Sequence, residues 1–212
     1  SSPLPSPLPS PSPSHAQNDT AEILTYPDAN TDSHHDLASF LQYTERTGLD
    51  RRSTVFVGTH YEYTVASVLS AYGFSLRRIG GQFDFGIDLL GTWAVPSTTS
   101  SSSPSPPPSA NSSHPPLKVL LSCKVSMKTG PALARELEGA FVGAPAGWRG
   151  SGVLGLLVSQ RPATKGVRDA LGRSRWPMGY ISCTRAGYVQ QMLWNRRAEE
   201  EGLAGVGVGM RY

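Results

Sequence analysis

The chain has 212 residues, with 18 Pro and 22 Gly, and its hydrophobic share (38%) and charged share (17%) are both below the averages for a globular domain. The formal net charge is +3, but residues 1–50 hold seven acids and one base while residues 51–212 hold nine acids and eighteen bases, which suits a folded domain with phosphate ligands. The short apolar runs exclude a membrane-spanning helix, and two cysteines without a CxxC motif exclude a disulfide framework and a cysteine zinc site.

The N-terminal part of the chain is predicted to be a disordered leader over residues 1–35, because residues 1–14 alternate Pro with Ser and Leu and the remainder is acidic. A single α/β domain is predicted over residues 36–212. It begins with a helix at 36–46 and a stronger helix at 59–72, in which apolar residues recur at helical spacing.

Three strands are predicted next, at residues 74–79, 87–95 and 117–125. Residues 96–116, between the last two, are rich in Pro, Ser and Thr and are predicted to form a disordered loop insert, since lengthening a loop costs little closure entropy. Pro131 begins a helix, and the remaining elements are a strand at 152–159, a helix at 164–173, a strand at 178–183 and a last helix at 184–200. The order α-β-β-β-α-β, then α-β-α, predicts a mixed sheet flanked by helices.

Two neighbouring strands carry the candidate chemistry. Asp88 follows a glycine-rich turn in the sequence GGQFDFGIDLL, and an ionised carboxylate in an apolar strand is costly unless it is paired or binds a cation. In the next strand, KVLLSCKV, Ser122 and Lys124 point to one face and Leu121 and Cys123 to the other. An aspartate and a lysine so placed indicate either a metal-dependent phosphodiester-cleaving site or a salt bridge without a catalytic role.

The order of these motifs resembles a known superfamily. Tyr61-Glu62 in a helix, Gly86-Ile87-Asp88-Leu89 and then Cys123-Lys124 are similar to the Mrr-like branch of the PD-(D/E)xK nucleases. The segments GTHYEYTVASVL, GGQFDFGIDLLGTW, LLSCK and LWN resemble the fungal mitochondrial "required for respiratory growth protein seven" family, from about residue 35 to the C-terminus. The resemblance implies a restriction-endonuclease-like fold, a mitochondrial location, Mg²⁺ as a cofactor and DNA as a partner.

The resemblance also implies roles for individual residues. Asp88 would bind the metal, Lys124 would be the catalytic lysine, and Glu62 would be the acid of the first helix that helps to hold the metal. The pattern Thr59-x-x-Glu62 is also that of a capping box, so both interpretations of Glu62 remain open. Asp84 matches a second acid of the glycine-rich turn, or it simply forms that turn.

Ser122 departs from the superfamily pattern, which has Glu or Gln at this position. Serine is neutral and too short to reach the same metal position, although it could act through a bridging water. We therefore expect weak Mg²⁺ binding, because Mg²⁺ can still be held by one or two carboxylates plus substrate phosphates. Cys123, at the variable position between Ser122 and Lys124, is expected to pack in the core.

Other candidates have plainer interpretations. His34 and His35 are expected to be a solvated pair in the leader, and His60 a surface residue near a helix start; Trp194 and Asn195 are expected to pack within the last helix. Five basic residues could flank a nucleic-acid groove or be ordinary solvated bases: Lys128, Arg135, Arg161, Lys165 and Arg168. The motifs GxxxxGK, GxSxG and HExxH are absent from the sequence, so it gives no support to an ATPase, a serine hydrolase or a zincin.

Three hypotheses follow. The first is a Mg²⁺-dependent phosphodiesterase acting on DNA, with Asp88 and Glu62 on the metal and Lys124 and Ser122 completing the catalytic set. The second is a catalytically degenerate protein that only binds nucleic acid. The third is a mitochondrial maintenance or assembly factor that uses the fold as a scaffold.

Overall fold

A computed structural model covers the chain and describes residues 24–27, 33–80, 86–96 and 115–206. The predictions of disorder for residues 1–14 and for most of the insert at 96–116 lie outside the described residues. Within the described ranges, no helix is long and apolar enough to cross a membrane.

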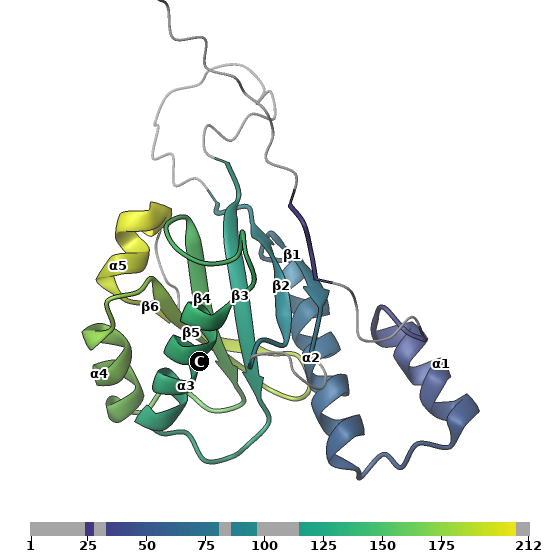
Figure 1. Ribbon diagram of the computed structural model, residues 1–212. Coiled ribbons are helices and arrows are strands. Elements are labelled where there is room, and N and C mark those ends of the chain that lie inside the picture. Colours follow the sequence, from purple (N-terminus) through teal and green to yellow (C-terminus); the bar gives the residue numbers. More distant parts are fainter. Residues whose placement is uncertain (1–23, 28–32, 81–85, 97–114, 207–212) are drawn as a thin grey trace, which may run out of the picture.

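Six strands form one mixed sheet, with their order in space the same as their order in the chain (Figure 1). β1, β2 and β3 pair antiparallel, β3, β4 and β5 pair parallel, and β6 returns antiparallel to β5. The strands are β1 (Phe74–Arg78), β2 (Leu89–Trp93), β3 (Leu117–Lys124), β4 (Val153–Ser159), β5 (Met178–Cys183) and β6 (Val189–Trp194). The predicted α/β class with a mixed sheet is confirmed.

Helices cover both faces of the sheet. They are α1 (Leu37–Thr47), α2 (Thr54–Ser70), α3 (Pro131–Gly143), α4 (Lys165–Arg173) and the short α5 (Arg196–Ala198), which runs into a π-helical turn at Glu199–Leu203. Side chains of Asp36, Ser53 and Thr164 cap α1, α2 and α4 by accepting backbone N–H bonds. The order from α2 to β4 is therefore α-β-β-β-α-β, as predicted.

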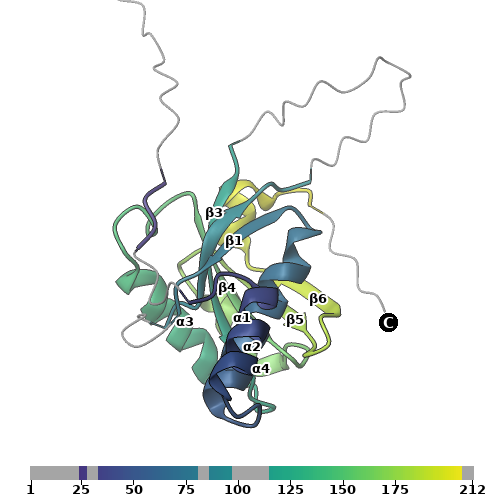
Figure 2. The same cartoon turned by 90° about the vertical axis from the view of Figure 1, so that its right-hand side faces the viewer.

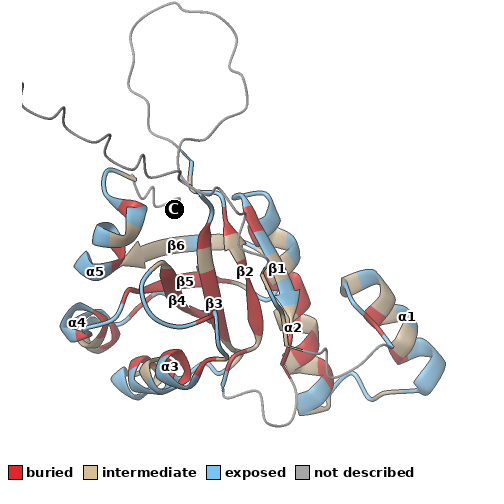
Figure 3. Cartoon of the chain, turned by 45° about the horizontal axis from the view of Figure 1, so that its top comes forward, coloured by how far each residue is buried: buried red, intermediate tan, exposed pale blue. Residues whose placement is uncertain are grey.

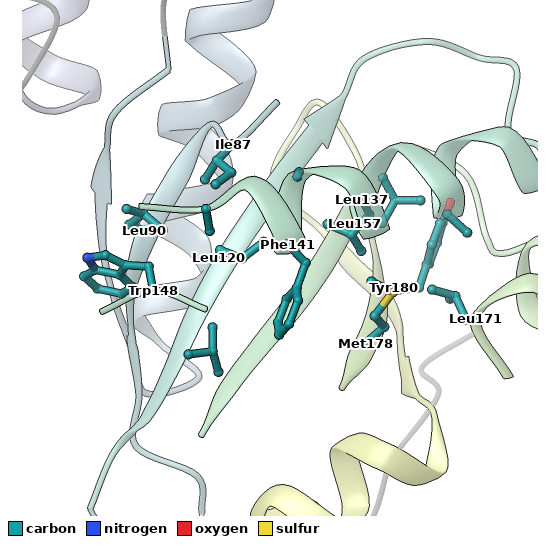
Figure 4. Packing of buried hydrophobic residues seen from close by; sticks show 14 of the residues in the cluster. Ile87, Leu90, Leu120, Leu137, Phe141, Trp148, Leu157, Leu171, Met178 and Tyr180 are labelled. Atoms are coloured by element: carbon teal, nitrogen blue, oxygen red, sulfur yellow. The ribbon is translucent and has the colours of Figure 1, made fainter. Parts of the chain in front are cut away.

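Alternating residues of the central strands belong to two hydrophobic cores on opposite faces of the sheet. Leu120 and Leu157 pack under α3 and α4 with Phe141 and Tyr180 (Figure 4). The intervening residues of the same strands pack against α2 on the other face. Figure 3 shows the buried residues gathered on the strands and on the helix sides turned toward them. α1 packs outside α2 through a smaller aromatic cluster (Figure 2).

The predicted last helix at 184–200 is wrong. The chain turns at Gly187, whose φ of 86° favours glycine, and residues 189–194 then pair with the open edge of β5. The sequence VQQMLW fits an edge strand as well as a helix, and pairing with β5 satisfies backbone groups that would otherwise stay open. Trp194 and Asn195 do pack, but at the end of β6 and not within a long helix, with Trp194 against Trp93 at 6.1 Å between ring centroids.

Parts of the predicted disordered leader belong to the folded domain. Trp148 donates its indole N–H to the carbonyl of Thr25 (2.8 Å), and the ring of Tyr26 packs on that of Trp148 at 5.0 Å. The prediction of disorder is therefore wrong for residues 24–27, because the aromatic area that they share with Trp148 offsets the cost of ordering them.

The prediction that His34 and His35 are both solvated is wrong for His34. His35 is exposed, but His34 is 9% exposed and lies 2.7 Å through Nδ1 from the hydroxyl of Tyr63. Its ring also contacts those of Phe40 and Tyr43. Aromatic residues of α1 and α2 thus draw His34 into the cluster between these helices.

Candidate functional site

Asp88 lies directly before β2, at the end of the sheet where β3 finishes. Its backbone N–H donates to Leu121 (2.9 Å), and its carbonyl accepts from the N–H groups of Ile79 (2.9 Å) and Gly80 (3.0 Å). Its carboxylate Oδ2 accepts the N–H of Cys123 at 2.6 Å. Asp88 is thus tied through both backbone and side chain to the two strands beside it.

Glu62 lies in the middle of α2 and pairs with a base of the edge strand β1. Its Oε2 is 2.5 Å from Nε of Arg78, and the two side chains are only 12% and 13% exposed. Arg78 also reaches Oγ1 of Thr59 at 3.4 Å and lies over the ring of Tyr63 at 5.8 Å. α2 begins at Thr54, with Ser53 as its cap, so Thr59 and Glu62 lie inside the helix and the capping-box interpretation is wrong.

The two carboxylates meet at Gly80. A Cβ built on Gly80 would lie 3.3 Å from both Oδ1 of Asp88 and Oε2 of Glu62, which is a crowded separation for a methyl group. The missing side chain therefore leaves room for two anionic groups that come from different elements. The structure thus brings together Asp88 and Glu62, the two residues proposed from sequence as metal ligands.

Lys124 ends β3 and turns its ammonium toward α3. Its Nζ lies 3.2 Å from Oε2 of Glu136, and the lysine side chain is 31% exposed. The peptide N–H that binds the carboxylate of Asp88 belongs to Cys123, the residue just before Lys124. Asp88 and the backbone of Lys124 are therefore close, while the convergence of the Asp88 carboxylate with the Lys124 ammonium stays a prediction.

Ser122 and Cys123 line the same end of β3. Ser122 is 3% exposed and lies opposite Leu157 of β4. Cys123 packs against the core on the α2 side, as expected. Burial raises the pKa of the Cys123 thiol well above its usual value, and the nearby charges of Asp88 and Glu62 raise it further. Cys123 is therefore a thiol that stays protonated.

The carboxylate oxygens of this site suit weak binding of a hard cation such as Mg²⁺. Among the residues that the structure describes, no group of three or more His, Cys, Asp or Glu side chains is placed to hold a metal ion. Two carboxylates, Glu62 and Asp88, do converge, and Mg²⁺ is commonly held by one or two carboxylates together with waters and substrate phosphates. Asp84 lies outside the described residues.

The five basic residues proposed to flank a groove are exposed and lie where β3 and β4 end or where α3 and α4 begin: Lys128, Arg135, Arg161, Lys165 and Arg168. Two of them have local partners: Lys165 pairs with Asp169 at 2.7 Å, and Arg168 donates to the carbonyl of Ala163 at 3.0 Å. This edge of the sheet is also the edge of Lys124. Their role toward nucleic acid stays a prediction.

His60 is placed differently from its prediction. It lies within α2 rather than at its start, is half-buried and stacks on Phe56 at 5.5 Å between ring centroids. Sequence reasoning also missed two partners of the candidate site, Arg78 and Glu136. Their only signal in the sequence is a charge opposite to that of Glu62 and Lys124, and many exposed residues share that property.

The fold and the site define an α/β protein with a six-stranded mixed sheet that carries a carboxylate pair and a lysine at one end of its central strands. Residues 53–212, which include the whole candidate site, match the family model described as Required for respiratory growth protein 7. The chain therefore belongs to this family. The comparison with solved structures gave no significant match.

Curated relatives come from several fungi. An uncharacterized mitochondrial protein of Schizosaccharomyces pombe is 30% identical over 170 residues, which are 78% of this chain and 61% of that protein. The mitochondrial Required for respiratory growth protein 7 of Saccharomyces cerevisiae S288c is 28% identical over 167 residues, covering 66% of this chain and 69% of the relative. That of Eremothecium gossypii is 34% identical over 122 residues, 47% of this chain and 51% of the relative. The chain spans less than two thirds of the first of these proteins, and it is mitochondrial by these relationships.

Proposed function

We propose that this chain is a metal-dependent phosphodiesterase that acts on DNA in mitochondria, within the PD-(D/E)xK superfamily and with its restriction-endonuclease-like fold. One observation carries the proposal: the carboxylates of Glu62 and Asp88, from separate elements, converge at Gly80 beside the end of β3 that bears Lys124. The α-β-β-β-α-β order from α2 to β4 supports the fold assignment. The role in respiratory growth is taken from the family description.

Each side chain of the site has a distinct part in this proposal. Asp88 and Glu62 would hold Mg²⁺, which when bound polarises a phosphate and lowers the pKa of its water. Lys124, about one third exposed, would stabilise negative charge that develops on the phosphate. Both Glu62 and Lys124 are ion-paired, with Arg78 and Glu136, so each must share or exchange its partner when metal and substrate bind.

The second candidate function is a catalytically degenerate nucleic-acid-binding or maintenance factor. Two observations favour it: buried Ser122 stands where the superfamily has a polar ligand, and ion pairs already engage Glu62 and Lys124. In this case the carboxylates and the lysine stabilise the fold, and the exposed basic residues bind nucleic acid without cleaving it.

The deciding experiment titrates the full chain with MgCl₂ and MnCl₂ by calorimetry and incubates it with labelled duplex DNA at several salt concentrations. We expect weak metal binding and metal-dependent cleavage, both lost in Asp88→Asn, and cleavage alone lost in Lys124→Gln. Glu45→Gln, an exposed change in α1 away from the site, is the control and should match the wild type. If the chain does not bind metal and does not cleave DNA under any of these conditions, the phosphodiesterase proposal is overturned. The catalytically degenerate protein is then the remaining candidate.

A substitution at Ser122 tests whether the lack of a third carboxylate weakens metal binding and cleavage. Because Ser122 is 3% exposed, the shorter carboxylate of Ser122→Asp fits better than that of Glu. If the site binds metal, the added anionic oxygen should tighten binding and raise cleavage. Thermal melting with and without Mg²⁺ separates this result from simple misfolding, since a metal ligand makes the melting temperature rise with Mg²⁺.

A further inference from the structure

A basic cleft lies at the opposite end of the sheet from Asp88 and Lys124. It occupies about 400 Å³ between the end of α4 and the start of α5, which Figures 1 and 3 show near each other at the β6 side of the molecule. This size is within the range of ligand pockets. Its location follows from the sheet, because residues 178–179 of β5 pair with the first half of β4 and with the end of β6.

The lining of the cleft is strongly cationic. It contains the four guanidinium groups of Arg173, Arg175, Arg196 and Arg197 and a single carboxylate, that of Glu200. The remaining lining residues are glycine or neutral polar residues, and none of the lining side chains is apolar. The cleft therefore has a surplus of positive charge, and charged and polar side chains line it.

The contacts within the cleft leave donors available on the arginines. Glu200 accepts from Arg197 at 2.8 Å and pairs with Arg196 at 3.2 Å, so one carboxylate serves two guanidinium groups. Arg173 donates its Nε to the backbone carbonyl of Asp169 at 3.0 Å. Because each guanidinium has five N–H donors, these bonds use only part of the donor capacity of the group.

A buried asparagine fixes the floor of the cleft. Asn195, 6% exposed, accepts the N–H groups of Met178 (3.1 Å) and Ala198 (3.0 Å) through Oδ1. Its amide group donates to the carbonyls of Leu171 (3.0 Å) and Trp176 (2.8 Å). One side chain thus joins the end of α4, the start of β5 and α5, and it sets the spacing between the two pairs of arginines.

We propose that this cleft binds consecutive phosphates of a nucleic-acid backbone. Guanidinium groups bind phosphate oxygens through paired, charge-assisted hydrogen bonds, and a DNA strand presents a phosphate about every 3.4 Å of helix axis. An anionic membrane surface is the less suitable occupant, because stable interfacial binding also needs large apolar side chains and none is among the residues that line the cleft. The inference rests on the proposed function only in taking nucleic acid as the ligand.

The cleft and the carboxylate site are far enough apart to be tested separately. The seven residues of β4 span the sheet between the two ends, which is roughly 20 Å at the usual rise of a strand. A backbone that lies along this side of the domain could therefore reach both sites, with the cleft as an anchor away from the cleavage site.

The test removes two guanidinium groups and keeps the hydrogen bonds of Asn195 that hold the cleft together. The variant Arg175→Gln/Arg196→Gln loses the exposed Arg196–Glu200 ion pair but keeps the Arg197–Glu200 pair and the bond from Arg173 to the end of α4. The control Arg51→Gln/Arg52→Gln removes the same charge from two exposed arginines before α2. Fluorescence anisotropy of labelled duplex DNA is measured for the full chain over a range of salt concentrations.

We expect the cleft variant to bind duplex DNA about tenfold more weakly at low salt. The slope of log K against log salt concentration should also be about 2 smaller in magnitude, because each lost phosphate contact removes about 0.9 from it. The control should retain wild-type affinity within about twofold, since it alters only long-range charge. Equal losses in the two variants would overturn the inference, as would a wild-type chain that does not bind duplex.

The outcomes separate this inference from the proposed function. If the chain does not cleave DNA but the cleft variant selectively loses affinity, the phosphodiesterase fails and the cleft stands. If the chain cleaves DNA and the two variants bind alike, the cleft fails and the phosphodiesterase stands. Flotation with vesicles of phosphatidylcholine and phosphatidylglycerol is a parallel measurement, and a cleft variant that loses vesicle binding while it keeps duplex binding overturns the proposal.

Discussion

The ion pair between Glu62 and Arg78 makes a quantitative prediction about stability. Glu62→Gln keeps the shape of the side chain but removes its charge, and the pair is nearly buried, with side chains 12% and 13% exposed and a separation of 2.5 Å. Hydrogen bonds to charged groups contribute about 1.5–3 kcal/mol. Because Arg78 keeps its contacts with Thr59 and Tyr63, we expect a loss of about 2 kcal/mol, or a melting temperature lower by about 4–8 °C for a chain of this size.

A double-mutant cycle with Arg78→Gln isolates the interaction between the two side chains, measured by urea unfolding. The exposed pair Lys165 and Asp169 is the matched control, and its coupling should be too small to resolve. A Glu62–Arg78 coupling energy as small as that of the control would refute the reasoning. Repeating the melts with Mg²⁺ tests the second role of Glu62: if it is a metal ligand, Mg²⁺ raises the melting temperature of the wild type more than that of Glu62→Gln.

Two further predictions concern the fold. Gly91→Ala should destabilise the chain by about 1–3 kcal/mol or more in urea unfolding, because the added Cβ would overlap the carbonyl of Ser75 where β1 meets β2; Gly172→Ala, with open space around its Cβ position, is the control. Burial, with a contribution from Arg78, lowers the pKa of His34, so the unfolded chain binds the proton more readily and stability should fall as the pH drops below about 6.5. His34→Gln should weaken this dependence in melts from pH 7.5 to 5.5, and an unchanged slope would contradict the assignment.

Most elements could be predicted because their signals are local. β3 and β4 are apolar runs of strand length, and they are buried on both faces as parallel central strands usually are. Pro131 marks the first residue of α3, where its missing N–H costs nothing. The apolar run of β3 and its period of two residues also predict that Ser122 and Lys124 lie at the end of a strand beside Asp88.

The failures come from contacts that join distant parts of the chain. Residues 189–194 form a strand because the edge of β5 is available, and a window of sequence does not contain that information. His34 is buried because Tyr63 and the aromatic residues of α1 surround it. One failure has a local cause instead: α2 begins at Thr54 rather than at Thr59 because Ser53 is its cap, and this earlier start removes Glu62 from the helix end.

The sequence by itself determined the order of the elements as far as β5, the basic character of the folded part and the presence of an aspartate and a lysine on neighbouring strands. These depend on composition and on periodicities of two and 3.6 residues. Only the tertiary structure decided that Glu62 pairs with Arg78, that Lys124 pairs with Glu136, and that Gly80 leaves room for two carboxylates. It also decided that arginines from α4 and α5 share one cleft. These groups come from elements far apart in the chain, so their distances are set by how helices pack on a twisted sheet and not by their spacing in the sequence.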